Sequence, residues 1–211
     1  MKILKESDKS VINDAIKILE NDGVICFATE TVYALSCNAS SDIAVQKLYK
    51  IKARDPKKPI AVFTRDLKTA EKFLNFNQQE KAIAKKFMPG PITLVLQQKS
   101  PKDQEIKISK FLNSNDENLG LRIPNHEFCL ELLSKFNGAI ATTSANPSNM
   151  EAAVDFIQAK KYFCDKVDLI IDGGICHHKI ASTVLRIENG NVKIIREGLI
   201  TKEQLDDTKT N

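Results

Sequence analysis

The feature that most constrains the fold is an apolar run, GVICF at residues 23–27, which ends abruptly in the polar sequence ATETVY at residues 28–33. A short, uninterrupted apolar run is typical of a strand that is buried on both faces of a sheet. Two threonines, a glutamate and a tyrosine then stand where a strand end ordinarily carries Gly, Asn or Pro. Ligands of open α/β sheets collect at the carboxyl ends of strands, so residues 28–33 are a candidate wall of a binding site.

Helical and strand patterns alternate along the rest of the chain. We expect helices over residues 10–21, 43–51 (capped by Ser40, Ser41 or Asp42), 78–87 and 127–136, and strands over residues 23–27, 59–63, 92–96, 119–123, 139–141, 167–171, 182–187 and 192–195. The pair Asn189-Gly190 predicts a hairpin between the last two strands. This alternation predicts an α/β fold, a mixed sheet with helices packed on it, in one domain over residues 1–205. We expect residues 100–118 to form a mobile insertion and residues 206–211 a frayed tail.

Composition narrows the class of protein only a little. The net charge of +4 suits phosphate-bearing ligands or a nucleic-acid face, although a solvated basic surface is the simpler explanation. No apolar run approaches membrane-spanning length, and the amino end is too polar for a signal peptide. The five cysteines show no paired spacing, which favours a reducing, cytoplasmic compartment. The cluster Cys176-His177-His178 lacks a second pair of ligands at metal-binding spacing, so we expect no metal site.

Polar and basic residues follow most of the predicted strands, and each group also has a structural explanation. Residues 29–31 could cap a turn, residues 144–146 could form one, and the lysines and arginine of residues 52–58 could be a solvated face. Arg122 and Arg196 differ because each adjoins an apolar strand sequence that could carry it to a buried face. A buried arginine requires an anionic partner.

The inventory of these strand ends consists of hydroxyls, amides and cations, without a plausible pair of nucleophile and base. The sequences typical of serine hydrolases, zinc proteases and phosphate-cradling loops are absent from the chain. Such a site suits an anion-rich ligand and the stabilisation of developing negative charge. Phosphoryl or nucleotidyl transfer fits this description, because positioning and charge neutralisation supply most of its catalysis.

Seven motifs in a fixed order carry a resemblance to a known family. They are TETVYAL (29–35), KIKARDPKKPI (50–60), PGPITLVL (89–96), LGLRIP (119–124), TTSANPS (142–148), STVLRI (182–187) and IIREGLI (194–200). In this order they resemble the YrdC family of threonylcarbamoyl-adenylate synthases, over nearly the whole chain and in the short, single-domain form. The resemblance implies a twisted α/β sheet around a deep basic cavity.

The resemblance also implies a reaction and its participants. L-threonine, bicarbonate or CO2, and ATP would give L-threonylcarbamoyl-AMP and pyrophosphate, with Mg²⁺ accompanying the ATP. Partner enzymes would then transfer the threonylcarbamoyl group to the adenosine beside the anticodon of certain tRNAs. Weak, salt-sensitive binding of tRNA itself is a further expectation.

Site residues follow from the motif positions that match. Those implied to surround the threonine are Thr31, Arg122, Ser144 and Ser182, with the Arg122 guanidinium forking onto the carboxylate. Those implied to contact ATP are Lys52, Arg54, Lys58, Asn146 and Arg196, and Lys52 and Arg54 form the catalytic Lys-x-Arg pair.

Several positions depart from the family pattern: Ala34, Asp55, Phe63, Asn118, Asn149 and Val154. The departures remove no charged group, so we expect activity to survive, while Phe63 puts the amino-acid selectivity in question. Two other functions stay open at this point. One is a non-catalytic RNA-binding module with a basic concavity, and the other is a carbamoyl-adenylate enzyme with a different acceptor.

Overall fold

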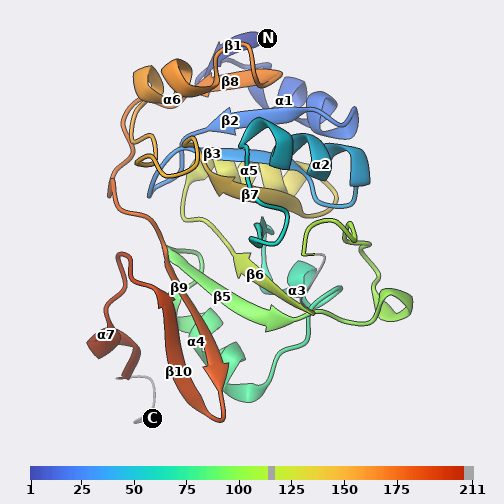
Figure 1. Ribbon diagram of the computed structural model, residues 1–211, viewed down its shortest axis with the longest axis vertical. Helices are drawn as coiled ribbons and strands as arrows, with labels where there is room; N and C mark the ends of the chain where they lie inside the picture. The colour runs from blue at the N-terminus through green and yellow to red at the C-terminus, as the bar shows by residue number, and fades with distance from the viewer. Residues whose placement is uncertain (114–116, 207–211) are drawn as a thin grey trace.

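The computed structural model describes residues 1–113 and 117–206, and this part of the chain contains a mixed sheet of ten strands (Figure 1). The strands are β1 (Lys2–Lys5), β2 (Val24–Phe27), β3 (Ala34–Asn38), β4 (Ala61–Phe63), β5 (Ile92–Gln97), β6 (Asn118–Arg122), β7 (Ile140–Ser144), β8 (Leu169–Asp172), β9 (Thr183–Glu188) and β10 (Asn191–Arg196). Their order across the sheet is β1-β8-β2-β3-β7-β4-β6-β5-β9-β10. Figure 1 shows β2 and β3 running across the view and β9 and β10 running down it, so the sheet is strongly twisted.

The helices are α1 (Val11–Glu20), α2 (Asp42–Ile51), α3 (Leu67–Ala70), α4 (Gln78–Phe87), α5 (Glu127–Lys135), α6 (Phe156–Phe163) and α7 (Lys202–Asp206), with a 3₁₀ turn η1 (Pro101–Asp103). Of the helices in the described ranges, none has the length and apolarity that a lipid bilayer requires. Every strand and helix predicted from the pattern is present, which confirms the α/β fold class. The pattern missed β1, β3, α3, α6 and α7. The predicted frayed tail begins at Asp206, the last residue of α7, and its other residues lie outside the described ranges.

Helices cover the two faces of the sheet, and the alternation of side chains along β2 decides which face each residue joins. Ile25 and Phe27 pack with residues of α1 and α5, including an aromatic contact between Phe27 and Phe128 at 5.6 Å between ring centroids. Val24 and Cys26 face the opposite side, where α2 packs and Leu48 is fully buried. Because both faces are covered, β2 reads as a continuous apolar run.

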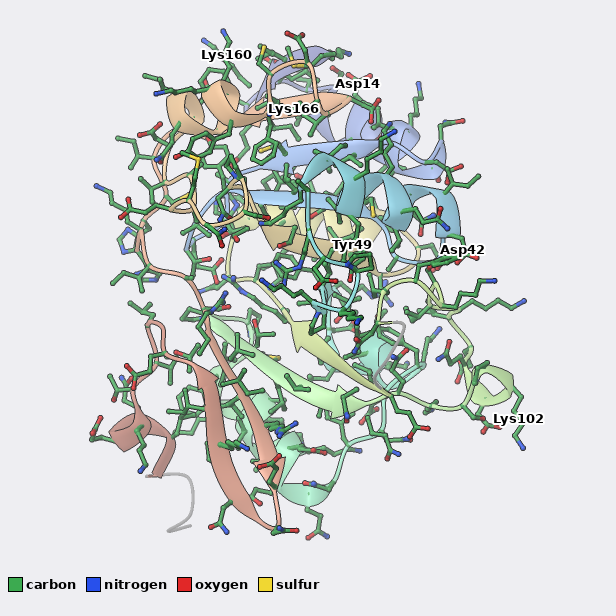
Figure 2. All side chains as sticks on the ribbon, viewed as in Figure 1. Asp14, Asp42, Tyr49, Lys102, Lys160 and Lys166 are labelled. Carbon is green, nitrogen blue, oxygen red and sulfur yellow. The ribbon has the colours of Figure 1, made fainter. Side chains whose placement is uncertain are left out.

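The polar sequence over residues 100–118 contains residues that hold it against the core of the protein. Leu112 is fully buried in the core, and the hydroxyl of Ser109 donates to the Asp42 carboxylate at 2.6 Å. Tyr49 of α2 (Figure 2) donates from its hydroxyl to the backbone oxygen of Leu112 at 2.9 Å. Residues 100–113 therefore pack against α2, and the rest of the predicted mobile insertion includes residues 114–116, outside the described ranges.

The hairpin between β9 and β10 has the geometry that its sequence predicts. Asn189 and Gly190 have φ of 50° and 75°, and these left-handed values are characteristic of a two-residue hairpin turn. Further along β10 the register shifts between Ile194 and Arg196. Such a bulge bends the strand and re-aims its side chains.

Helix α2 determines the position of Lys52, the first residue of the predicted Lys-x-Arg pair. The Ser41 hydroxyl accepts a hydrogen bond from the Ala44 backbone N–H at 3.1 Å, which confirms the predicted N-cap. Lys52 is the C-cap residue of the same helix, so the packing of α2 determines the position of the Lys52 backbone.

We expect Leu48→Ala to lower the free energy of unfolding by about 2–5 kcal/mol, because it removes a fully buried side chain and leaves a cavity. The matched control is Ile43→Ala on the same helix, where the side chain is 67% exposed and the loss should stay near about 0.5 kcal/mol. Urea unfolding followed by circular dichroism measures both. Equal losses would show that α2 is not held by its buried face.

Candidate functional site

A cavity of about 350 Å³ opens over the middle of the sheet. Its floor consists of side chains at alternate positions on neighbouring strands, because residues two apart on a strand share a face. They are Ala34 of β3, Thr142 and Ser144 of β7, Ala61 and Phe63 of β4, Asn118, Gly120 and Arg122 of β6, Thr93 and Val95 of β5, Val184 and Arg186 of β9, and Ser182 just before β9. This is the face that α1 and α5 cover at β2, as the packing of Ala34 and Phe63 with those helices indicates.

Strand β7 is longer than predicted, and this changes the place of its hydroxyls. The sequence pattern ended the strand at residue 141 and put Thr142 and Ser144 in a following loop, whereas both belong to β7. Both line the cavity, so their polarity reflects the cavity face and not a turn. The Thr142 hydroxyl also hydrogen-bonds the Ser36 hydroxyl of β3 at 2.8 Å.

The ATETVY sequence forms a tight turn at the cavity wall. The Thr29 hydroxyl accepts from the backbone N–H groups of Thr31 and Val32 at 3.1 and 3.2 Å and donates to the Val32 carbonyl at 2.7 Å. This pattern supports the interpretation of Thr29 as a turn residue. The neighbouring Thr31 hydroxyl instead accepts a hydrogen bond from Arg122 at 2.9 Å.

Arg122 has its anionic partner within the protein. Its Nη2 lies 2.7 Å from Glu30 Oε1, and the two side chains are only 5% and 7% exposed. The Glu30 carboxylate also accepts from the backbone N–H of Asn125 at 3.1 Å. Sequence reasoning noted Glu30 as an unusual carboxylate but assigned it no role, because its partner lies 92 residues away in the chain. The ion pair ties the turn after β2 to the end of β6.

One nitrogen of the Arg122 guanidinium, Nη1, is available to hydrogen-bond a ligand. Nε donates to the Gly90 carbonyl at 3.3 Å, and Nη2 is held by Glu30 and Thr31. Among the residues that the structure describes, none accepts a hydrogen bond from Nη1. The Phe63 ring lies against the guanidinium face, with 5.4 Å between the ring centroid and Cζ. Protein contacts therefore hold this cation in place before any ligand binds.

Three further arginines line the cavity, Arg54, Arg186 and Arg196, and no carboxylate occurs among the described lining residues. Arg54 donates to the backbone oxygens of Lys58 and Pro59 at 3.1 and 2.9 Å. Burial lowers the pKa of Arg54, and the pKa of Arg196 is lowered by burial first and then by repulsion from Arg122 and Arg54. The arrangement concentrates positive charge and attracts a multiply charged anion.

The exposure of Arg196 differs from the prediction. The sequence suggested a buried arginine, but Arg196 as a whole residue is solvent-exposed. Only its guanidinium is partly buried, where it donates to the Ser182 carbonyl at 2.7 Å and the Ser182 hydroxyl at 3.1 Å. The reason is the bulge in β10, which lets the adjacent residues Ile195 and Arg196 both line the cavity.

Lys52 is buried, and no carboxylate of the described residues pairs with it. It is 3% exposed, and its ammonium contacts the Ser144 backbone oxygen and Asn146 Oδ1, the latter at 3.0 Å. Burial, followed by repulsion from Arg54 and Arg196, lowers the pKa of Lys52 from 10.5 to about 7. Lys52 and Asn146 thus adjoin the cavity through Ser144.

The structure brings together most of the predicted site residues. Thr31, Arg122, Ser144, Ser182, Arg54 and Arg196 line the cavity. The side chain of Lys58 does not, since this residue is exposed and contributes its backbone oxygen to Arg54 and Tyr49. Sequence reasoning missed Arg186, Thr93 and Glu30, although all three lie within the quoted motifs. Alternation along β5 and β9 was the signal that could have found Thr93 and Arg186.

Some departures from the family pattern have a visible physical basis. Asn149 has φ of 66°, a left-handed value that Gly adopts freely and that Asn tolerates better than most residues. Ala34, Phe63 and Asn118 all line the cavity, so these positions bear directly on a ligand. No group of three or more His, Cys, Asp or Glu side chains in the described ranges is placed to hold a metal ion.

Fold and site together define an α/β protein with an arginine-lined cavity on one sheet face, which suits a small polyanionic ligand. The chain matches the Sua5/YciO/YrdC family, whose description reads "Telomere recombination", over residues 17–198. This protein belongs to that family.

Similar proteins carry names that specify an activity. A provisionally named threonylcarbamoyl-AMP synthase of Methanocaldococcus jannaschii is 34% identical over 95% of this chain and 92% of its own length. The threonylcarbamoyl-AMP synthase of Psychromonas ingrahamii is 31% identical over 82% and 88%. The crystal structure of Pyrococcus abyssi Sua5 complexed with L-threonine superposes with a TM-score of 0.90 at 25% identity, over 99% of this chain and 60% of that one.

We expect Glu30→Gln to lower the free energy of unfolding by about 3–5 kcal/mol, because it leaves the buried Arg122 cation without a counter-ion. The control is Glu131→Gln, which breaks the Lys135–Glu131 pair. That pair has the same 2.7 Å separation but side chains that are about half exposed, so the loss should not exceed about 1 kcal/mol. Chemical denaturation at pH 7 measures both. Similar losses would contradict the view that burial gives the Glu30–Arg122 pair its importance.

A second prediction concerns the Lys52 proton. With a pKa of about 7, Lys52 is largely neutral at pH 8 in the empty cavity, and a bound anion should raise the pKa and drive proton uptake. Titration calorimetry with tripolyphosphate at pH 8, in two buffers of different ionisation enthalpy, measures that uptake. The difference between wild type and Lys52→Met should approach one proton at pH 8 and vanish at pH 6, where Lys52 is already charged. Identical uptake in the two proteins at pH 8 would contradict the assignment.

Proposed function

We propose that this protein forms L-threonylcarbamoyl-AMP and pyrophosphate from L-threonine, bicarbonate or CO2, and ATP. The observation that carries the proposal is the arginine-lined cavity, free of carboxylates among its described lining residues, in a member of this family. Relatives named threonylcarbamoyl-AMP synthase match most of the chain. The product would serve the modification of the adenosine beside the anticodon of certain tRNAs.

Threonine binds at the Arg122 end of the cavity. The guanidinium is already oriented by Glu30, Thr31 and Phe63, and its Nη1 is available for the substrate carboxylate. The binding is therefore through one nitrogen of a fixed cation and not through the two-armed fork that the sequence suggested. Ser182, 2.9 Å from the Thr93 hydroxyl, and Ser144 supply hydroxyls for the amine and the side chain of threonine. The similarity to a Sua5 that binds L-threonine supports this part of the proposal.

ATP occupies the part of the cavity near Arg54, Lys52 and Asn146. Arg54 is fixed by two backbone carbonyls and Lys52 by Ser144 and Asn146, so both cations are held before the nucleotide arrives. Arg196 also lines the cavity and adds positive charge there. The side chain of Lys58 is exposed and is not among the residues that line the cavity, so its contact with ATP stays a prediction.

The reaction has two steps in this proposal. The threonine amine attacks CO2, forms the N–C bond of a carbamate and loses a proton. A carbamate oxygen then attacks the α-phosphorus of ATP, the new O–P bond forms, and the bond to the β-phosphate oxygen breaks with release of pyrophosphate. Arg54 and Lys52 offset the charge that develops on the leaving group, and interactions of this kind contribute most in the transition state.

The proposal also includes Mg²⁺, partner enzymes, tRNA and a cellular location. Mg²⁺ prefers carboxylate and phosphate oxygens, and the described cavity lining offers no carboxylate, so the ion arrives as part of the Mg·ATP substrate. Partner enzymes that accept threonylcarbamoyl-AMP, weak tRNA binding and a cytoplasmic location belong to the same proposal. The five free cysteines, four of them buried, suit a reducing compartment.

Mass spectrometry of reactions with ¹³C-bicarbonate tests the proposal directly. We expect purified protein to form labelled threonylcarbamoyl-AMP with L-threonine, and Lys52→Ala should lower kcat roughly 100-fold or more, since a cation at the leaving group acts mainly in the transition state. A panel of other amino acids in place of threonine, with pyrophosphate release as readout, shows whether Phe63 permits a different acceptor. Binding of tRNA that ATP does not displace, together with no product, would favour a non-catalytic RNA-binding module instead.

A further inference from the structure

Arg186 belongs to the cavity, but none of the roles described above uses it. It lies on β9, on the same face as Val184, and it lines the cavity with Arg54 and Arg196. The register pairs it with Val95 of β5, and Val95 in turn pairs with Gly120 of β6. Arg186, Val95 and Gly120 therefore lie at one level across three neighbouring strands, and all three line the cavity.

The position of Arg186 along the strands separates it from the threonine end. Arg122 lies two residues beyond Gly120 on β6, which corresponds to about 7 Å of strand length. Ser182 lies four residues before Arg186 on β9, or about 13 Å. A ligand bound to Arg122 and Ser182 therefore leaves Arg186 for a group further along the cavity.

The contacts of Arg186 leave part of its hydrogen-bonding capacity unused. Its Nε is buried and has no hydrogen-bond partner in the described part of the chain. Nη2 forms an ion pair with Glu188 Oε1, and Lys193 pairs with the other oxygen of Glu188 at 3.0 Å. All three side chains are more than a third exposed, and ion pairs of this kind contribute only about 0–1 kcal/mol, so Glu188 can release Arg186 at little cost.

We propose that Arg186 binds the β- and γ-phosphates of ATP and the pyrophosphate that leaves, with Glu188 holding the guanidinium when the site is empty. This inference rests on the proposed function for the identity of the nucleotide, but the binding of pyrophosphate can be measured without turnover. A guanidinium presents paired N–H donors that match phosphate oxygens, which an ammonium does not. Arg186 and Arg54 both line the cavity, and in this proposal the two cations share the charge of the leaving group.

Three variants distinguish a direct contact between Arg186 and pyrophosphate from a general effect of positive charge. Arg186→Gln removes the guanidinium from the cavity. Lys193→Gln removes the same unit charge from the residue paired with Arg186 on β10, which does not line the cavity. Glu188→Gln removes the competing carboxylate. Each protein is titrated with pyrophosphate, with AMP and with L-threonine by calorimetry, after circular dichroism and thermal melting have shown that it is folded.

We expect Arg186→Gln to weaken pyrophosphate binding about tenfold or more, the loss typical of a charged hydrogen bond, and to change AMP and L-threonine affinities less than about twofold. Lys193→Gln should weaken pyrophosphate binding less than about threefold, with the effect disappearing at high salt. Glu188→Gln should strengthen it. Unchanged pyrophosphate binding in Arg186→Gln, or an equal loss of threonine binding, would overturn the inference.

The same measurements separate this inference from the proposed function. If wild-type protein binds pyrophosphate through Arg186 but forms no threonylcarbamoyl-AMP, the polyphosphate site stands and the proposed reaction fails. If product forms normally and Arg186→Gln leaves both pyrophosphate binding and product inhibition by pyrophosphate unchanged, the reaction stands and the role of Arg186 is wrong.

Discussion

The buried ion pair between Glu30 and Arg122 is the interaction on which the cavity depends. It joins the turn after β2 to the end of β6, two strands that are separated in the sheet by β3, β7 and β4. A buried cation without a counter-ion would be costly, and so would a buried carboxylate. The pair therefore requires both segments to be in place, and Nη1 of the guanidinium has no acceptor among the described residues. The turn geometry of Thr29 and the stacking of Phe63 support the same arrangement.

The remaining cations are placed where they repel one another, and this is the physical basis of anion binding. Burial lowers the pKa of Lys52, Arg54 and Arg196, and repulsion from neighbouring cations lowers it further for Lys52 and Arg196, so the empty cavity holds positive charge at a cost to stability. For Lys52 the sign is clear: its folded-state pKa of about 7 lies below its ordinary value, so the cost falls as pH rises from about 7 to 10.5. A polyphosphate ligand offsets the same cost at neutral pH. Binding and protonation are therefore coupled through one lysine.

Much of the fold could be predicted from local pattern, and the limits of that prediction have identifiable causes. The long helices α1, α2, α4 and α5 carry clear apolar periodicity and were predicted within two residues of their bounds. Strand β3 was missed because it begins immediately after the TETVY turn and includes the polar Ser36, whose partner Thr142 lies on another strand. Residues 100–113 read as a polar insertion because their few apolar residues, Ile106, Ile108, Phe111 and the buried Leu112, are scattered among polar ones. Local patterns do not report contacts of this kind.

The sequence by itself determined the class of fold, the order of the motifs and the chemical character of the site, because apolar periodicity and residue type are local properties. It also determined that Arg122 would need an anion. Only the tertiary structure decided that this anion is Glu30, that the bulge in β10 leaves Arg196 exposed, and that Lys58 stays outside the cavity. It likewise brought Arg186 into the cavity, because strand register and pleat decide which alternate residues share a face. Register depends on pairing between strands that are distant in the chain.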